Sequence, residues 1–407
     1  MSRFLKIAIV LLAIAAMATP VMAEDMLSLG GQARVRGWYK DFDTDSTNSY
    51  IDQRLRIGGK LSVADGVSIT FRTDITEQAW GNGGSEYGSG RMGGTQQWDR
   101  AHIDLTKGNV HVRAGQQYVG YGLAQTINSQ DAGFKVDFKG AVPVSAFWLL
   151  DDQNGTNADS YLYGANAGFK GDNFKANLFG GGQTKSDLLQ EENVYMLGAD
   201  VVFNLEALTL SSELNYFTGD ASDDVDAVGL QFFLDAAFAV SETLTVGGEF
   251  YYAQGTDDVD ERQYTYLGND FNGYDPLFDL GTSLHDEQIM FGRPFDLVQS
   301  IVGAGFGAAN NFTTAETDAA NSSGALGARV YAKAKVSDSV SLGGSFAYME
   351  PEEDVDGFDS AMFYADSMKY KVMANTSLQA QLQYVDLDAD LEQDNAILGG
   401  VGLFVNF

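Results

Sequence analysis

Arginine recurs at every second position early in the chain, a spacing that could hold anionic groups. Arg34 and Arg36 are two residues apart, Arg54 and Arg56 repeat the pattern, and Arg72 follows on the next segment. A guanidinium group offers a planar fork of N–H donors that matches a carboxylate or a phosphate. A two-residue period places the members of each pair on one face of a β-strand. The row therefore predicts anion binding along a wall of strands.

Candidates for catalysis are few. The chain contains three histidines, His102, His111 and His285, and no cysteine. A hydrolase needs a histidine beside a nucleophile or a carboxylate. His102 and His111 fall on the charged faces of adjacent strands, where they could lie near each other, but they stand among arginines. We interpret them as further lining groups, and we expect no enzymatic activity, no cofactor and no metal site.

Alternation of apolar and polar residues continues along nearly the whole chain, from Leu29 to Phe407. We expect about 18 strands of roughly ten residues, the length that a tilted strand needs to cross a bilayer. The connections alternate between tight turns, such as Ala64-Asp65-Gly66, and longer acidic loops. This pattern predicts an all-β fold, namely a closed antiparallel transmembrane β-barrel with short periplasmic turns and longer external loops.

A soluble β-sandwich or β-solenoid is the competing fold for an exported, glycine-rich chain of 407 residues. It would not need loops that alternate in length, whereas closure into a barrel removes the edge strands that invite aggregation. In a barrel the apolar rows face lipid, because an arginine at mid-depth on that face would cost about 2–4 kcal/mol. The arginines would then face a water-filled lumen.

We expect residues 1–23 to be a secretory signal peptide and residues 24–407 to be the barrel. Arg3 and Lys6 precede the apolar run 7–18, and Val21-Met22-Ala23 has the small-residue pattern of a cleavage site. A membrane anchor is the weaker interpretation, because the apolar run is shorter than the ~20 residues of a spanning helix.

The charged residues on the lumen face separate into two groups along the chain. The basic candidates are Arg34, Arg36, Arg54, Arg56, Lys60, Arg72, Arg100 and Arg113. The acidic candidates are Asp200, Glu213, Asp235 and Glu249. In a ring of about 18 strands the third lies opposite the twelfth, so a basic wall would face an acidic one. The two walls would create an electric field across the pore, and anions would move along the arginines. The structural alternative is that the arginines pair with nearby aspartates and stiffen the wall.

Two longer segments could narrow the pore. Residues 81–95 are glycine-rich and could be a constriction loop or an external loop. Residues 253–324 are too long for a passive loop and contain apolar pieces, so we expect an external lid or an inward plug. A third feature is the set of acidic external loops, at 220–226, 257–261 and 352–356. None has the spacing of a calcium loop, so we interpret them as solvated loops.

The segments Gln53-Arg54-Leu55-Arg56, 67–74 and Ala79-Trp80-Gly81 resemble the first hairpins of the alginate-export and related substrate-specific porin-like families. Phe407, preceded by alternating apolar residues, resembles the signal by which Gram-negative outer-membrane barrels are recognised for assembly. The resemblance implies a barrel of about 18 strands in the outer membrane, with an arginine-lined lumen. It also implies contact with the barrel-assembly machinery through Phe407.

These features predict an outer-membrane porin whose water-filled channel passes small hydrophilic solutes by diffusion, with a preference for anions and carboxylates. Export of an anionic, alginate-like polysaccharide and a structural or conduit role are the alternatives. The partners we expect are outer-membrane lipid and lipopolysaccharide, the assembly machinery and the solutes themselves. A homo-oligomer is compatible with the sequence, and no nucleic acid is expected.

Overall fold

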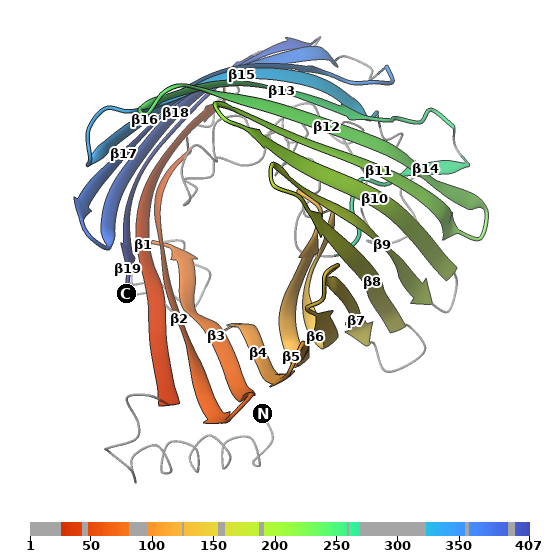
Figure 1. Cartoon of the computed structure of the whole chain (residues 1–407). Helices are drawn as coiled ribbons and strands as arrows, with labels where there is room; N and C mark the ends of the chain where they lie inside the picture. Colours follow the sequence, from red (N-terminus) through yellow and green to blue (C-terminus); the bar gives the residue numbers. More distant parts are fainter. Residues whose placement is uncertain are drawn as a thin grey trace.

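The fold is a closed ring of antiparallel strands, as Figure 1 shows for the computed structural model. The described residues are 26–42, 48–80, 97–123, 126–153, 159–186, 191–258, 260–268, 323–354, 358–389 and 395–407. The expected signal peptide, the segment 81–95 and most of the expected lid or plug, residues 269–322, lie outside them. No helix among the described residues is long and apolar enough to cross a membrane.

Eighteen strands form the wall, and β14 is an additional short strand. The ring closes where β1 pairs with β19. The strands are β1 (Leu27–Phe42), β2 (Asn48–Ala64), β3 (Val67–Ala79), β4 (Gln97–Lys107), β5 (Val110–Tyr121), β6 (Ile127–Phe138), β7 (Val144–Gln153), β8 (Asp159–Lys170), β9 (Phe174–Ser186), β10 (Glu191–Leu205), β11 (Leu208–Ser222), β12 (Val225–Ser241), β13 (Leu244–Ala253), β14 (Glu261–Gln263), β15 (Ala325–Lys335), β16 (Val340–Glu350), β17 (Phe358–Met373), β18 (Thr376–Ala389) and β19 (Asn395–Asn406). The predicted closed antiparallel barrel is confirmed.

Apolar side chains point outward around the ring. Leu29, Leu197 and Val330, on well-separated strands, are 62%, 59% and 60% exposed. Large apolar side chains are this exposed in a stable protein only when another apolar medium covers them. The outer surface is therefore built to face lipid, and the polar residues that alternate with these side chains face inward.

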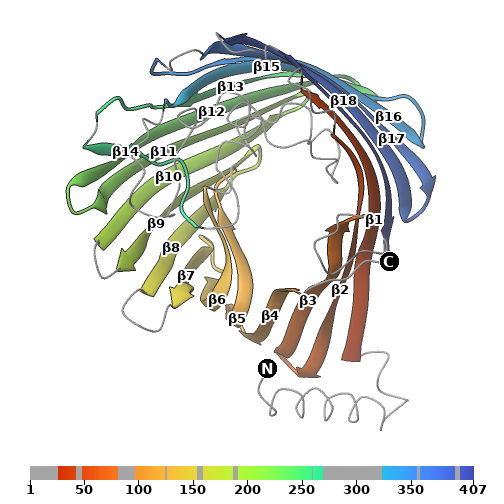
Figure 2. The same ribbon diagram turned by 180° about the vertical axis from the view of Figure 1, so that it is seen from behind.

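The two strands β5 and β6 leave the wall before they end. β5 pairs with β4 only as far as Gln116, and β6 pairs with β7 only as far as Ala132. Beyond these points the two strands pair with each other, out to Tyr121 opposite Ile127. Figures 1 and 2 show this end of the pair inside the ring. We call residues 117–123 and 126–131 the inner hairpin.

The inner hairpin creates a hydrophobic core inside the barrel. It contributes Val119, Tyr121 and Ile127, which are at most 4% exposed. The lumen faces of β7 to β12 are apolar at the same place and contribute Phe147, Leu149, Leu162, Phe179, Val194, Met196, Phe217, Ala221 and Ala227. One side of the lumen is therefore packed, while the side formed by β1 to β4 carries the arginines.

The start of the segment 253–324 adds a second inward piece. β14 pairs in parallel with the beginning of β12, and Leu267 forms a bridge with Ile127 of the inner hairpin. The Asn128 amide donates to the Leu267 carbonyl at 2.9 Å, and the Leu267 amide donates to the Thr126 carbonyl at 2.8 Å. The chain thus passes from β12 to the hairpin, and we call residues 260–268 the inner segment.

The acidic stretch 220–226 differs from the sequence expectation of a longer loop. β11 continues to Ser222 and β12 begins at Val225, so only two residues connect them. Asp220 and Asp226 lie across from each other in the ladder. The hydrogen-bonded ladder of β11 and β12 continues beyond the ends of their apolar rows. Alternation in the sequence marks only the apolar rows, so it could not indicate this extension.

Candidate functional site: the pore lining

The predicted basic residues form a descending row on the lumen side of β1 to β5. Arg34 lies across from Arg54. Arg56 lies two residues further along β2, which is one step lower, towards the turn between β2 and β3. Arg72 lies one further step lower, across from Arg100. Each such step spans about 7 Å along a strand. We call Arg34, Arg54, Arg56, Arg72, Arg100 and Arg113 the basic staircase.

Like charges face each other directly within this row. Arg34 is paired with Arg54, Arg72 with Arg100, and Arg113 with Lys135. Like charges opposite each other on neighbouring strands destabilise a sheet. A hollow of about 490 Å³ lies along the middle of the row and is bordered by Gln32, Arg54, Arg56, Lys60, Arg72 and Arg100.

Carboxylates hold several of these guanidinium groups in place. Arg36 donates to both oxygens of Asp52 at 2.8 and 2.7 Å, and the Trp38 indole donates to the same carboxylate at 2.9 Å. Arg56 binds both oxygens of Asp74 at 2.6 and 2.7 Å. Bidentate pairs fix the plane of a guanidinium as well as its position. The structure thus combines rigid Arg–Asp pairs with arginine–arginine neighbours.

The four acidic candidates on the opposite side engage in local contacts. Asp200 accepts hydrogen bonds from the Asn177 amide and is 5% exposed. Asp235 accepts one from the Tyr331 hydroxyl at 2.9 Å. Glu249 pairs with Arg329, whose side chain is buried, at 3.0 Å. These contacts place the acidic groups against the wall.

Glu213 differs most from its expected place in the lumen. It is 1% exposed, because the inner hairpin covers it. Its carboxylate accepts hydrogen bonds from the Thr126 hydroxyl at 2.5 Å, from the Leu123 backbone amide, and from the Asn215 side-chain amide at 2.7 Å. Glu213 therefore fastens the tip of the hairpin to β11 and does not face channel water.

Glycine is required at the tip of the hairpin. Gly122 has a φ of +85°, and a Cβ there would lie 2.7 Å from the Glu213 carboxylate and 2.9 Å from the Phe179 ring. Only glycine adopts this conformation readily and leaves room for so close an approach. The tip therefore packs directly against β9 and β11.

Other contacts fix the base of the inner hairpin and the inner segment. Gln130 donates to the Asp99 carbonyl at 2.7 Å, and Gln117 donates to the Gly133 carbonyl at 3.0 Å. In the inner segment, Gly268 donates its amide to Gln183 of β9 at 3.1 Å. Tyr264 is 2% exposed, and burial raises the pKa of its phenol well above the usual range. The constriction is therefore attached to the wall at several points.

The sequence reasoning missed the inner hairpin as a constriction. The outward apolar row stops at Ala114 and resumes only at Phe134, and this interruption was the available signal. Between them, Val119, Tyr121 and Ile127 fall at odd positions, on the face opposite to that of Ala114 and Phe134, so the lipid-facing row does not continue. A stretch that cannot cover a lipid face must leave the wall or project beyond it.

Sequence comparison finds no matching family model and no matching curated protein. Solved structures do match. OccK11 (OpdR) of Pseudomonas aeruginosa is 11% identical, with a TM-score of 0.57 over 94% of this chain and 96% of that chain. OccAB4 of Acinetobacter baumannii is 11% identical, with a TM-score of 0.57 over 96% of this chain and 100% of that chain.

A third match is the anion-selective porin from Comamonas acidovorans, which is 12% identical. Its TM-score is 0.50 over 94% of this chain and 99% of that chain. This chain has the porin fold. At such identities the likeness concerns the fold alone, so a function must be argued from the lining residues of this chain.

Proposed function

We propose that the protein is an outer-membrane porin that passes small hydrophilic solutes and prefers anions. The observation that carries the preference is the set of like-charge neighbours in the basic staircase. Arg34 lies across from Arg54, and Arg72 and Arg100 share the single carboxylate of Asp99, so positive charge is in excess along this row. An anion that moves along the row would relieve this repulsion at each step.

The inner hairpin favours small solutes over a polymer. Its tip contacts Glu213 on β11, and Leu267 of the inner segment packs beside it, so the two pieces occupy part of the lumen. A passage narrowed in this way suits ions and small carboxylates better than an alginate-like chain. The same packing argues against the alternative of a structural or conduit role, because a barrel that surrounds a protein partner would need an open lumen.

The outer surface supports the proposed location. Its apolar rows suit outer-membrane lipid, and lipopolysaccharide would contact the upper rim. Phe407 is 58% exposed, and its backbone pairs with Gly31 of β1 through bonds of 2.7 and 3.0 Å. The C-terminal residue thus lies at the seam of the ring, where the assembly machinery would bind before closure.

Reversal potentials in planar bilayers under a potassium chloride gradient test the proposal. The wild-type channel should favour chloride over potassium. Replacement of Arg54, Arg56 and Arg72 by serine should shift the permeability ratio severalfold towards potassium, because three lumen charges are lost. Lys335→Ser is the matched control, since this lysine lies at the end of β15 and pairs with Asp338. Cation selectivity of the wild type, or an unchanged ratio in the triple variant, would overturn the proposal.

A further inference from the structure

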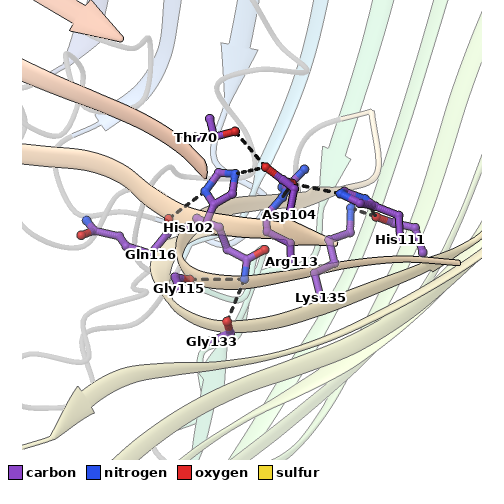
Figure 3. Close-up of polar contacts among 11 residues, drawn as sticks. Thr70, His102, Asp104, His111, Arg113, Gly115, Gln116, Gly133 and Lys135 are labelled. Carbon is purple, nitrogen blue, oxygen red and sulfur yellow. Dashed lines mark hydrogen bonds and ion pairs between the residues drawn. The ribbon is translucent and has the colours of Figure 1, made fainter. Parts of the chain in front are cut away.

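A second charged cluster surrounds Arg113, the lowest member of the staircase, towards the turns that join β2 to β3 and β4 to β5. Figure 3 shows its side chains, which come from adjacent strands and point towards one another. They border a hollow of about 440 Å³ on the lumen side, lined among others by Lys60, Arg100, His102, Asp104, His111 and Arg113. The two histidines noted in the sequence are therefore brought together.

Asp104 is the centre of this cluster. The Thr70 hydroxyl donates to one of its oxygens at 2.8 Å, and the His102 Nε2 lies 3.5 Å from that oxygen. The His111 Nε2 lies 2.9 Å from the other oxygen, and the Arg113 Nε lies 3.5 Å from it. One carboxylate that is 9% exposed thus faces four donor groups.

Both histidines have a ring nitrogen that faces a carboxylate oxygen and that would become a hydrogen-bond donor if the ring were protonated. The two ring nitrogens of His111 face carboxylate oxygens, Asp104 at 2.9 Å and Asp137 at 3.2 Å. An ionised carboxylate only accepts hydrogen bonds, and a neutral imidazole has a single N–H, so only the imidazolium donates in both contacts. His102 uses Nδ1 towards the Gln116 carbonyl at 3.1 Å, which leaves Nε2 without a proton in the neutral ring. Protonation of His102 would place a hydrogen on Nε2, which would then donate to Asp104.

Protonation would therefore change what Arg113 does. Two imidazolium groups and Thr70 would satisfy Asp104, and the hold of Asp104 on Arg113, an ion pair without a short hydrogen bond, would weaken. The guanidinium would then be available to a solute. The hollow would also gain two positive charges beside its permanent cations.

The surrounding charges also favour an anion. Lys60 comes from β2, Arg72 from β3, Arg100 from β4, and Lys135 with Asp137 from β6. Asp137 is occupied by His111 at 3.2 Å and by Lys135 at 3.3 Å. The donors approach the hollow from several strands, which suits a tetrahedral oxyanion better than a planar carboxylate.

We infer that this hollow binds a tetrahedral oxyanion of the sulfate and phosphate class, and that protonation of His102 and His111 tightens the binding. The inference rests on the proposed function, since the solute must pass through the lumen to reach the site. It adds a substrate class and a pH dependence that an arginine row alone would not have.

Sulfate is the suitable probe, because it remains a dianion between pH 5.5 and pH 8 whereas phosphate titrates. Chloride current through single channels of the full-length protein is recorded while sodium sulfate is added. We expect sulfate to reduce the current, with an apparent inhibition constant about tenfold lower at pH 5.5 than at pH 8. The variant His102→Gln/His111→Gln should bind sulfate equally, within twofold, at both pH values. Arg113→Gln should weaken sulfate binding at both.

Lys333→Gln is the matched control, because it removes a cation from β15, across the ring from β4 and β5. It should leave sulfate binding and its pH dependence unchanged.

Absence of inhibition at pH 5.5, or an unchanged pH dependence in the double histidine variant, would overturn the inference while chloride selectivity stands. Cation selectivity of the wild type in the same bilayers would instead contradict the proposed function. Retention of the folded barrel in each variant is checked by its heat-modifiable mobility on a gel.

Discussion

At the scale of residues, the effect of each charged side chain on the field in the lumen depends on the side chains beside it. Arg36 and Arg56 are each held by both oxygens of an aspartate, whereas Arg54 lies across from Arg34 and donates to the Gln32 side chain. The Arg–Asp pairs would stiffen the wall, and anion binding by the neighbouring arginines is the function proposed above. The aspartates moderate the field that a passing ion experiences.

Removal of these aspartates should strengthen the anion preference. In the variants Asp52→Asn and Asp74→Asn a lumen carboxylate is neutralised while its arginine stays, so the chloride-to-potassium permeability ratio should rise about twofold in each. Reversal potentials measure the change. The control is Asp366→Asn, because Asp366 pairs with Leu382 on the outward face. A fall in the ratio for Asp52→Asn or Asp74→Asn would contradict the view that these carboxylates face the ion path.

At the scale of elements, the inner hairpin and the inner segment occupy part of the lumen of a wide ring. Both are held by contacts with the wall that lie far apart in the sequence, such as Thr126 with Glu213 and Gly268 with Gln183. The apolar residues Val119, Ile127 and Leu267 bury one face of the hairpin. Its position depends on this packing and on one buried carboxylate.

Loss of that carboxylate should widen the channel. Glu213→Ala leaves the Thr126 hydroxyl, the Asn215 amide and the Leu123 amide without their acceptor, at a cost of about 1–3 kcal/mol for each buried donor. We expect a higher mean single-channel conductance and noisier current as the hairpin tip detaches. Asp200→Asn is the control, because Asp200 lies across from Glu213 and contacts Asn177. Equal conductance in wild type and Glu213→Ala would show that the hairpin does not limit the current.

At the scale of the whole molecule, the barrel separates two solvents. The outward row faces an apolar medium and the inward row faces water, so the same substitution has different costs on the two faces. Leu197 of β10 is 59% exposed on the outward face, and Ser367 lies on the inward face between Gly343 and Gln381. Membrane proteins of this class tolerate lumen charges and penalise lipid-facing ones.

Arginine scanning of the two faces tests this separation. Leu197→Arg should lower the free energy of unfolding in vesicles by about 2–4 kcal/mol, whereas Ser367→Arg should lower it by less than about 1 kcal/mol. Denaturant titration of the folded barrel in lipid vesicles gives both values. Equal losses would mean that the assigned faces are wrong.

The sequence by itself determined which side chains share a face. A period of two depends only on backbone geometry, so Arg54 with Arg56, or Leu378 with Leu382, could be assigned to one face without a structure. The number of alternating segments and the alternation of loop lengths then required a closed ring. These local signals predicted the barrel, confirmed here, and the arginines as one row.

Tertiary structure decided everything that depends on lateral neighbours. Strand register placed Arg34 across from Arg54 and brought His102 and His111 to Asp104. Inward folding of the hairpin covered Glu213, which on its own strand has the same periodicity as a pore-lining residue. Register and inward packing join residues that are distant in the chain, so no pattern within a single strand could specify them.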